Sequence, residues 1–305
     1  MYTHRAVSYV VEGTKVAGVL FEPAVKKATT GIVVLGPIGY VKEQSPMQYA
    51  SRLAIQGFTT LIFDPRGHGE SEGEPRRVED PDAKCAEVIA AAKYLESSCA
   101  EVYGLGICQG VNWMTKAVVS EGSPLSKVAL VAGNYLTPQV NAIMTGGNLE
   151  KRLAEADAAL AAFEKDGTLT YRPIVPGGPD DMVPFLPRAE IGTWYNEWDT
   201  TASARSSFQR FRGKWENRLA IHSEAKLWRH DVTQDFHRLT KPTLLIHSDA
   251  AATGPKVPRV LFDAIAAENK TLVWLPDGES QFMFYEHPLT IDTCVSHVVD
   301  FFSRV

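Results

Sequence analysis

The sequence predicts an α/β protein with a mostly parallel, doubly wound sheet into which a helical cap is inserted. Short apolar runs, typical of buried strands, alternate with helical patterns along the first third of the chain. Residues 150–240 break this alternation with an Ala/Glu/Lys-rich helix, a Pro/Gly stretch and an aromatic, polar region. We therefore expect a core made of residues 1–149 and 241–305, and a cap made of residues 150–240.

Each element is predicted from its own pattern. Alternating polarity on either side of Glu12 and Gly13 indicates an antiparallel hairpin, apolar runs indicate buried strands, and 3.6-residue spacing indicates helices. Gly57 suits the C-terminal end of the first helix. The expected strands are 6–12, 15–21, 31–35, 58–63, 102–105, 128–132, 242–247 and 271–275. The expected helices are 46–56, 80–97, one that ends at about 119, 149–165 and 288–303.

Composition narrows the class of protein. The chain has 305 residues, of which 45% are hydrophobic, enough for one large core or a core with a subdomain. A net charge of −5 without a basic block argues against nucleic acid as a partner. No apolar run reaches the length of a membrane span, and the first residues show no apolar signal-peptide core. We expect a cytoplasmic protein that acts on a small molecule without membrane contact, and we keep a homodimer open as its assembly.

The four cysteines show neither a C-x-x-C pair nor the spacing of metal ligands. In a chain of this size, that pattern favours free thiols in a reducing compartment. No cofactor and no metal site are expected. Cys85, Cys99 and Cys294 have no catalytic context and are expected to be structural.

Cys108 has a different context, because it lies in the pattern Gly106-Ile107-Cys108-Gln109-Gly110 after an expected strand. Glycines two residues before and after it allow the sharp strand-to-helix turn called a nucleophile elbow, here with cysteine where serine is usual. The start of a helix is expected to favour the thiolate. The alternative is a buried structural cysteine. The elbow predicts the α/β-hydrolase fold with Cys108 as the nucleophile.

Two backbone amides near the elbow form the predicted oxyanion site. One belongs to Gln109, and the other belongs to Ile38 or Gly39 in the turn that follows the strand at 31–35. Because main-chain donors do not depend on side-chain identity, this part of the site is expected to be intact.

Further motifs are spread over nearly the whole chain, at residues 39–44, 63–64, 69–76, 79–81, 104–108, 194–197, 215–218 and 278–288. Together they resemble the dienelactone-hydrolase-like α/β-hydrolases, and more closely the branch that includes fungal polyketide transferases. The resemblance implies an N-terminal hairpin, a cap, and acyl or ester chemistry at Cys108.

The chain departs from this family where a catalytic histidine and acid are expected. The histidine position holds Gln281, and the commonest acid position holds Ala251, with Asp249 as a shifted candidate. An amide can hydrogen-bond but cannot accept a proton from a thiol at neutral pH. A missing general base costs roughly 10²–10⁴-fold in rate. We assign Cys108, Gln281 and Asp249 as the catalytic residues, and weigh His247 or a cap histidine as a replacement base.

Aromatic residues of the cap are expected mainly to pack it, with one or two lining a pocket. They are Trp194, Tyr195, Trp198, Phe208, Phe211, Trp215 and Trp228. We assign Tyr40, Trp215 and Trp228 to substrate binding. The charge-rich stretch around Arg66, Arg76 and Arg77 is expected at the surface in a structural role.

These residues predict a cysteine-dependent enzyme that transfers, or weakly hydrolyses, the acyl group of a small or polyketide-like ester or thioester. Gln281 would orient the substrate or an attacking group. One alternative is a non-hydrolytic lyase, isomerase or cyclase that uses Gln281 and the oxyanion donors to polarise its substrate. The other is a catalytically inactive protein that keeps the pocket as a ligand receptor.

Overall fold

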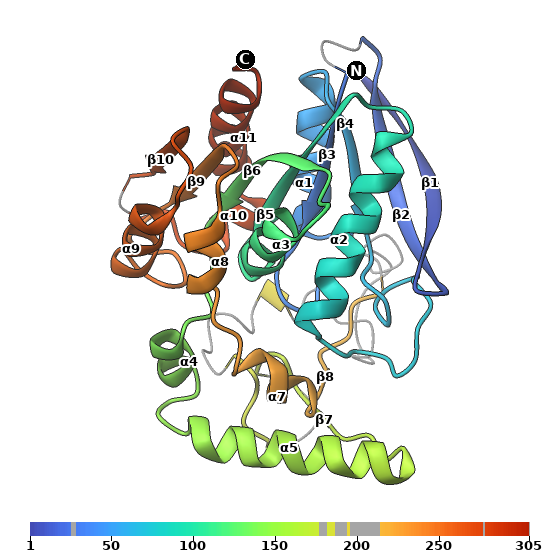
Figure 1. Cartoon of the computed structure of the whole chain (residues 1–305), viewed down its shortest axis with the longest axis vertical. Coiled ribbons are helices and arrows are strands. Elements are labelled where there is room, and N and C mark those ends of the chain that lie inside the picture. The colour runs from blue at the N-terminus through green and yellow to red at the C-terminus, as the bar shows by residue number, and fades with distance from the viewer. Residues whose placement is uncertain (26–28, 177–181, 187–193, 196–213, 277, 305) are drawn as a thin grey trace.

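The computed structural model describes residues 1–305 except 26–28, 177–181, 187–193, 196–213, 277 and 305. Within the described residues, an eight-stranded sheet in the order β1-β2-β4-β3-β5-β6-β9-β10 forms the centre of the molecule (Figure 1). β1 (Tyr2–Val11) and β2 (Thr14–Pro23) form an antiparallel hairpin, and β2 pairs antiparallel with β4. The parallel strands are β3 (Thr30–Leu35), β4 (Thr59–Phe63), β5 (Glu101–Ile107), β6 (Leu125–Val131), β9 (Thr243–His247) and β10 (Lys270–Trp274).

Every residue of β3 and β4 is buried, which is typical of parallel strands covered on both faces. α1 (Ser45–Ile55) packs against α11 (Pro288–Phe302), and α2 (Pro81–Glu96) packs against α3 (Gly110–Val119). Figure 1 shows α2 and α3 in front of the sheet. The predicted fold class and the predicted hairpin are therefore confirmed. α9 (Lys256–Ala264) and α10 (Met283–Glu286) are not among the predicted helices.

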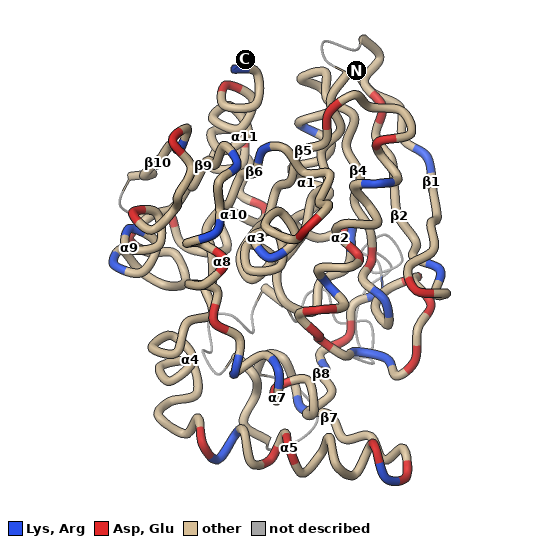
Figure 2. Tube along the Cα trace, in the orientation of Figure 1, with Lys and Arg blue, Asp and Glu red and all other residues tan. Residues whose placement is uncertain are grey.

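Most of the segment between β6 and β9 lies at the end of the molecule opposite both termini (Figure 1). The elements there are α4 (Pro138–Met144), α5 (Leu149–Asp166), β7 (Tyr171–Arg172), β8 (Leu219–Ala220) and α7 (Ser223–Leu227). α8 (Thr233–Arg238) belongs to the same segment but packs against α3 and α9. α5 carries residues of both charges along its length (Figure 2). Only Arg152 and Ala156 of this helix are buried. The cap boundaries of 150 and 240 stay a prediction.

Parallel strands bring the segments that follow them to one edge of the sheet. The turn after β3, the elbow after β5 and the loops after β6, β9 and β10 therefore meet, as is typical of ligand sites in doubly wound sheets. The described helices include none that is long and apolar enough to cross a membrane.

Candidate active site

Cys108 occupies the strained turn between β5 and α3. Its φ is +55°, in the left-handed region that a side chain other than glycine rarely adopts. The flanking glycines are required because the backbone packs too closely there for a side chain. A Cβ on Gly110 would lie 2.4 Å from the carbonyl oxygen of Gly36, and a Cβ on Gly106 would lie 2.8 Å from the carbonyl oxygen of Gly110. The geometry of a nucleophile elbow is therefore present.

Backbone contacts hold the elbow in this conformation. The amide of Cys108 donates to Val131 O (3.0 Å), and its carbonyl accepts from the amide of Asn134 (3.1 Å). The side chain of Asn112 donates to both Gln109 O and Asn134 O at 2.9 Å. Asn112, which the sequence patterns did not single out, thus fastens the start of α3 to the loop after β6.

The thiol is more basic than the sequence suggests. Burial raises the pKa of Cys108 to about 11, although hydrogen bonds from Tyr285, the Gln109 backbone and Gln281 act in the opposite direction. The expectation that the helix start favours the thiolate is wrong here, because desolvation of the anion outweighs the hydrogen bonds that lower the pKa. At neutral pH the resting group is the thiol.

Gln281 lies beside this thiol and is held by three hydrogen bonds. Its Nε2 donates to Ala132 O (2.9 Å) and to Tyr285 Oη (3.1 Å), and its Oε1 accepts from the amide of Ala252 (2.8 Å). These bonds join the loops that follow β6, β9 and β10. Gln281 is therefore a fixed neutral group at the position where a base is expected.

Two tyrosines that the sequence patterns did not assign to the site lie close to Cys108. Burial raises the pKa of Tyr285 well above its ordinary range, and its interactions with Cys108 and Tyr195 raise it further. Burial also raises the pKa of Tyr195, with Cys108 as the next cause. Both hydroxyls therefore stay protonated, so the thiol faces neutral hydrogen-bonding groups.

Asp249 is not brought to the thiol. It is exposed, and its Oδ1 accepts a hydrogen bond from Trp274 Nε1 at 2.9 Å. Ala251 is buried in the same loop, which reaches Gln281 through the amide of Ala252 instead of a carboxylate. Glu279 is also engaged elsewhere, since its Oε2 accepts from Thr290 Oγ1 at 2.6 Å.

No histidine of the described residues hydrogen-bonds to Cys108. His247 is buried at the end of β9, its ring centre 6.1 Å from that of Tyr135, and burial lowers its pKa to about 4. His230 contacts the edge of Trp113 at 4.9 Å between ring centres, and burial lowers its pKa to about 4 as well. Neither replaces the missing base.

The turn after β3 discriminates between the two predicted oxyanion donors. The amide of Gly39 donates to Glu79 Oε1 at 2.8 Å and is therefore occupied. The amide of Ile38 has no acceptor in the described part of the chain. The geometry favours Ile38, together with Gln109, as the donor pair.

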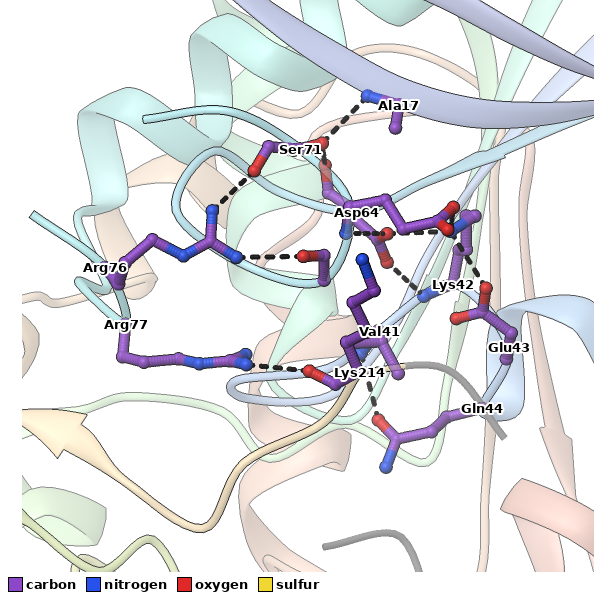
Figure 3. A network of polar contacts seen from close by, with 12 residues as sticks. Ala17, Val41, Lys42, Glu43, Gln44, Asp64, Ser71, Arg76, Arg77 and Lys214 are labelled. Carbon is purple, nitrogen blue, oxygen red and sulfur yellow. Dashed lines mark hydrogen bonds and ion pairs between the residues drawn. The ribbon is translucent and has the colours of Figure 1, made fainter. Parts of the chain in front are cut away.

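Buried charges support the chain immediately after this turn (Figure 3). Lys42 Nζ lies 2.8 Å from a carboxylate oxygen of each of Glu43, Asp64 and Glu70, and the Lys42 amide donates to Asp64 Oδ1 at 2.8 Å. The expected surface position of Arg77 is wrong, because its side chain is 1% exposed and pairs with Glu216 at 2.7 Å.

The residues assigned to substrate binding lie in different places. Tyr40 is 1% exposed, and its ring packs against Gly36 in the turn after β3. The packing is so close that a Cβ on Gly36 would lie 2.7 Å from the ring. Trp228 lies inside the cap and donates to Glu224 Oε2 at 2.7 Å.

Trp215 is connected to the thiol through aromatic neighbours. Its ring centre lies 5.4 Å from that of Tyr195, which lies 4.7 Å from Trp194, and Trp194 lies 5.1 Å from Tyr285. Asn196, Glu197, Trp198, Phe208 and Phe211 lie outside the described residues. The described ranges contain no cluster of three or more His, Cys, Asp or Glu placed to hold a metal ion.

Comparisons with known proteins agree with this architecture. A model of the alpha/beta hydrolase family matches residues 34–291. YcjY of Escherichia coli is 23% identical over 287 residues, which are 90% of this chain and 88% of that protein.

Solved structures give the same picture. The crystal structure of PA2218 from Pseudomonas aeruginosa has a TM-score of 0.77 at 23% identity, with 99% of this chain and 93% of that chain covered. The crystal structure of the alpha/beta hydrolase GrgF from Penicillium sp. sh18 has a TM-score of 0.77 at 17% identity, with 98% and 97% covered. The matches support the broad family, and the dienelactone-hydrolase-like branch stays a prediction.

Proposed function

Because the chain belongs to the alpha/beta hydrolase family, we propose that it is a cysteine-dependent acyl-processing enzyme that favours acyl transfer over hydrolysis. Membership in this family supports a hydrolytic or acyl-processing enzyme. The observation that carries the finer proposal is the conformation of Cys108, whose positive φ sets its buried thiol at the elbow turn, next to the Gln109 amide. The proposed substrate is a small or polyketide-like ester or thioester.

The proposed reaction has two steps. In the first, Sγ of Cys108 bonds to the acyl carbon, the bond from that carbon to the leaving group breaks, and the thiol proton goes to the leaving group. The amides of Gln109 and Ile38 stabilise the oxyanion that forms. In the second, a nucleophile of the acceptor attacks the thioester, the C–S bond breaks, and the acceptor's proton returns to sulfur.

Slow hydrolysis follows from the neutral groups around the thiol. Water needs a general base to attack a thioester efficiently, and such a base contributes about 10²–10⁴-fold. Gln281 cannot serve, and the raised pKa of Tyr285 keeps its hydroxyl protonated. An acceptor more nucleophilic than water, such as an amine or a thiol, is less dependent on that base.

The same neutral groups favour one second candidate. The Tyr285 hydroxyl and the Gln281 amide hydrogen-bond to each other at 3.1 Å beside the oxyanion donors. Because Tyr285 accepts this bond, its own O–H remains a donor that can polarise a carbonyl for addition, elimination or cyclisation without a covalent intermediate. In that case Cys108 would pack beside the substrate and would not react.

Acyl-enzyme trapping tests the proposal. We expect p-nitrophenyl acetate at pH 9 to add one acetyl group to Cys108, detected by intact mass and peptide mapping. Cys108→Ala should lose the label, and Cys294→Ala, which removes a buried thiol outside the site, should keep it. Gln281→His should release the acyl group at least tenfold faster by supplying a base.

The alternatives give different results. Labelling that survives Cys108→Ala contradicts the proposal. Turnover of a substrate that persists in Cys108→Ala supports the non-hydrolytic candidate. Ligand binding without label or turnover supports a receptor role.

A further inference from the structure

We propose that Glu79 is a positioning residue that fixes the turn at residues 38–39, so that the Ile38 amide completes the oxyanion site. This deepens the proposed function and rests on it, because the oxyanion site matters only if an acyl group reacts at Cys108. Glu79 precedes α2 in the sequence and is 1% exposed.

The contacts that set the position of the Glu79 carboxylate all reach one oxygen, Oε1, whereas Oε2 is buried without a hydrogen-bond partner among the described residues. Its Oε1 accepts from the amide of Gly39 at 2.8 Å and lies 3.2 Å from Lys84 Nζ. His68 Nε2 lies 3.5 Å from the same oxygen. Hydrogen bonds to an ionised acceptor are shorter and about twice as strong as neutral ones, so this contact orients the Gly39 amide firmly.

Holding one amide of the turn determines what its neighbour can do. Gly39 adopts φ +59°, so its amide points at Glu79 and is not available to substrate. Further along the same segment, the amide of Val41 is engaged by Gln44 Oε1 at 3.1 Å and that of Lys42 by Asp64 Oδ1. A buried amide without an acceptor is rare in proteins, and the unengaged Ile38 amide therefore suits a ligand oxygen.

Glu79 also connects the turn to the cap. Its own amide donates to Ser223 Oγ at 2.9 Å, at the start of α7. On the other side of the turn, a Cβ on Gly39 would lie 2.6 Å from Cδ1 of Ile174. The turn is therefore held between the carboxylate and a cap side chain, which leaves little room for another conformation.

Two double variants isolate the hydrogen bond from the charge. Glu79→Gln/Lys84→Met removes both charges of the pair and keeps an acceptor for Gly39. Glu79→Leu/Lys84→Met removes the acceptor as well. For each, the rate of acetylation of Cys108 by p-nitrophenyl acetate is divided by the rate of its alkylation by iodoacetamide, which forms no oxyanion.

We expect this ratio to fall about 10- to 100-fold in Glu79→Leu/Lys84→Met and to stay near the unaltered protein's value in Glu79→Gln/Lys84→Met. Glu87→Gln is the matched control. Glu87 is likewise 1% exposed but lies within α2, where it pairs with Arg66 at 3.0 Å and makes no hydrogen bond or ion pair to the described turn at residues 38–39. This control should lower stability without changing the ratio.

A ratio of acetylation to alkylation that is unchanged in Glu79→Leu/Lys84→Met overturns the positioning role, whether or not both rates fall. That result leaves the proposed acylation of Cys108 intact. Absence of acylation in the unaltered protein overturns the proposed function itself. If the leucine variant does not fold, Glu79→Ala/Lys84→Met replaces it, and hydrogen exchange at residues 36–44 is compared with that of Glu79→Gln/Lys84→Met. Faster exchange in the alanine variant supports the role, and equal exchange contradicts it.

Discussion

At the residue scale, Cys108 combines backbone strain with an undissociated thiol. A non-glycine residue at a positive φ costs about 1–3 kcal/mol, and it persists where the surroundings fix it. Here the amide bond to Val131 O and the carbonyl bond from Asn134 do so. The flanking glycines made this turn predictable from the sequence. The basic thiol was not predictable, because the groups that bury it, such as Tyr285 and Tyr195, are remote in the chain.

The raised pKa predicts how the thiol responds to pH. Because only the thiolate is alkylated, the rate with iodoacetamide should rise about tenfold per pH unit from pH 7 to 10, and level off only near the pKa of about 11. An ordinary thiol would level off near pH 8.5. The rate is followed by intact mass, with Cys108→Ala as the control. A plateau below pH 9 would show that the thiolate is stabilised after all.

The same shift has a consequence for stability. The pKa of the Cys108 thiol is higher in the folded than in the unfolded state. At pH values between these two pKa values, the native state therefore binds more protons than the unfolded state. The contribution of Cys108 to stability is therefore complete below about pH 8.5 and is lost as pH rises toward the folded pKa.

At the element scale, the site is made where neighbouring parallel strands end. The sequence predicts that the segments after β3, β5 and β9 meet, because parallel pairing places their carboxyl ends at one edge. It does not predict that Gln281 would join the loops after β6 and β9 through its side-chain amide. Nor does it predict that Asp249 would turn outward to Trp274. Loop conformation depends on contacts that strand patterns do not encode.

Gly110 at the start of α3 offers a test at this scale. An added Cβ would collide with Gly36 O at 2.4 Å and Leu35 O at 3.0 Å, so Gly110→Ala must separate the elbow from the oxyanion turn. We expect acetylation of Cys108 per folded molecule to fall at least tenfold, because catalysis is sensitive to displacements of about 1 Å. Gly122→Ala is the control, since its added Cβ meets nothing within 4 Å. It strains a residue with φ +69° and should leave acetylation unchanged.

At the scale of the whole molecule, one buried carboxylate links the elements of the cap. Glu224 is 0% exposed and contacts Arg152 at 2.7 Å and Arg172 at 2.6 Å, besides accepting from Trp228 Nε1. These partners come from α5, β7 and the end of α7. The sequence predicts a cap here, but not this centre, because Arg152 and Glu224 lie 72 positions apart.

Glu224→Gln should therefore destabilise the protein. It leaves two buried guanidinium groups without their shared anion, and breaking a buried pair typically costs about 3–5 kcal/mol. The free energy of unfolding in urea measures the effect. Asp157→Asn is the control, since Asp157 and its partner Arg229 are about half exposed and should contribute nothing measurable. Equal stability of the two variants would contradict a structural role for this cluster.

By itself, the sequence determined the α/β-hydrolase fold, the N-terminal hairpin and the elbow at Cys108. These follow from hydrophobic periodicity and glycine spacing, which are local and survive without knowledge of distant contacts. Only the tertiary structure decided that the Gly39 amide is occupied by Glu79, that Tyr285 and Gln281 surround the thiol, and that the thiol stays protonated. Those properties depend on burial and on partners far apart in the chain, and desolvation is set by the whole packed molecule.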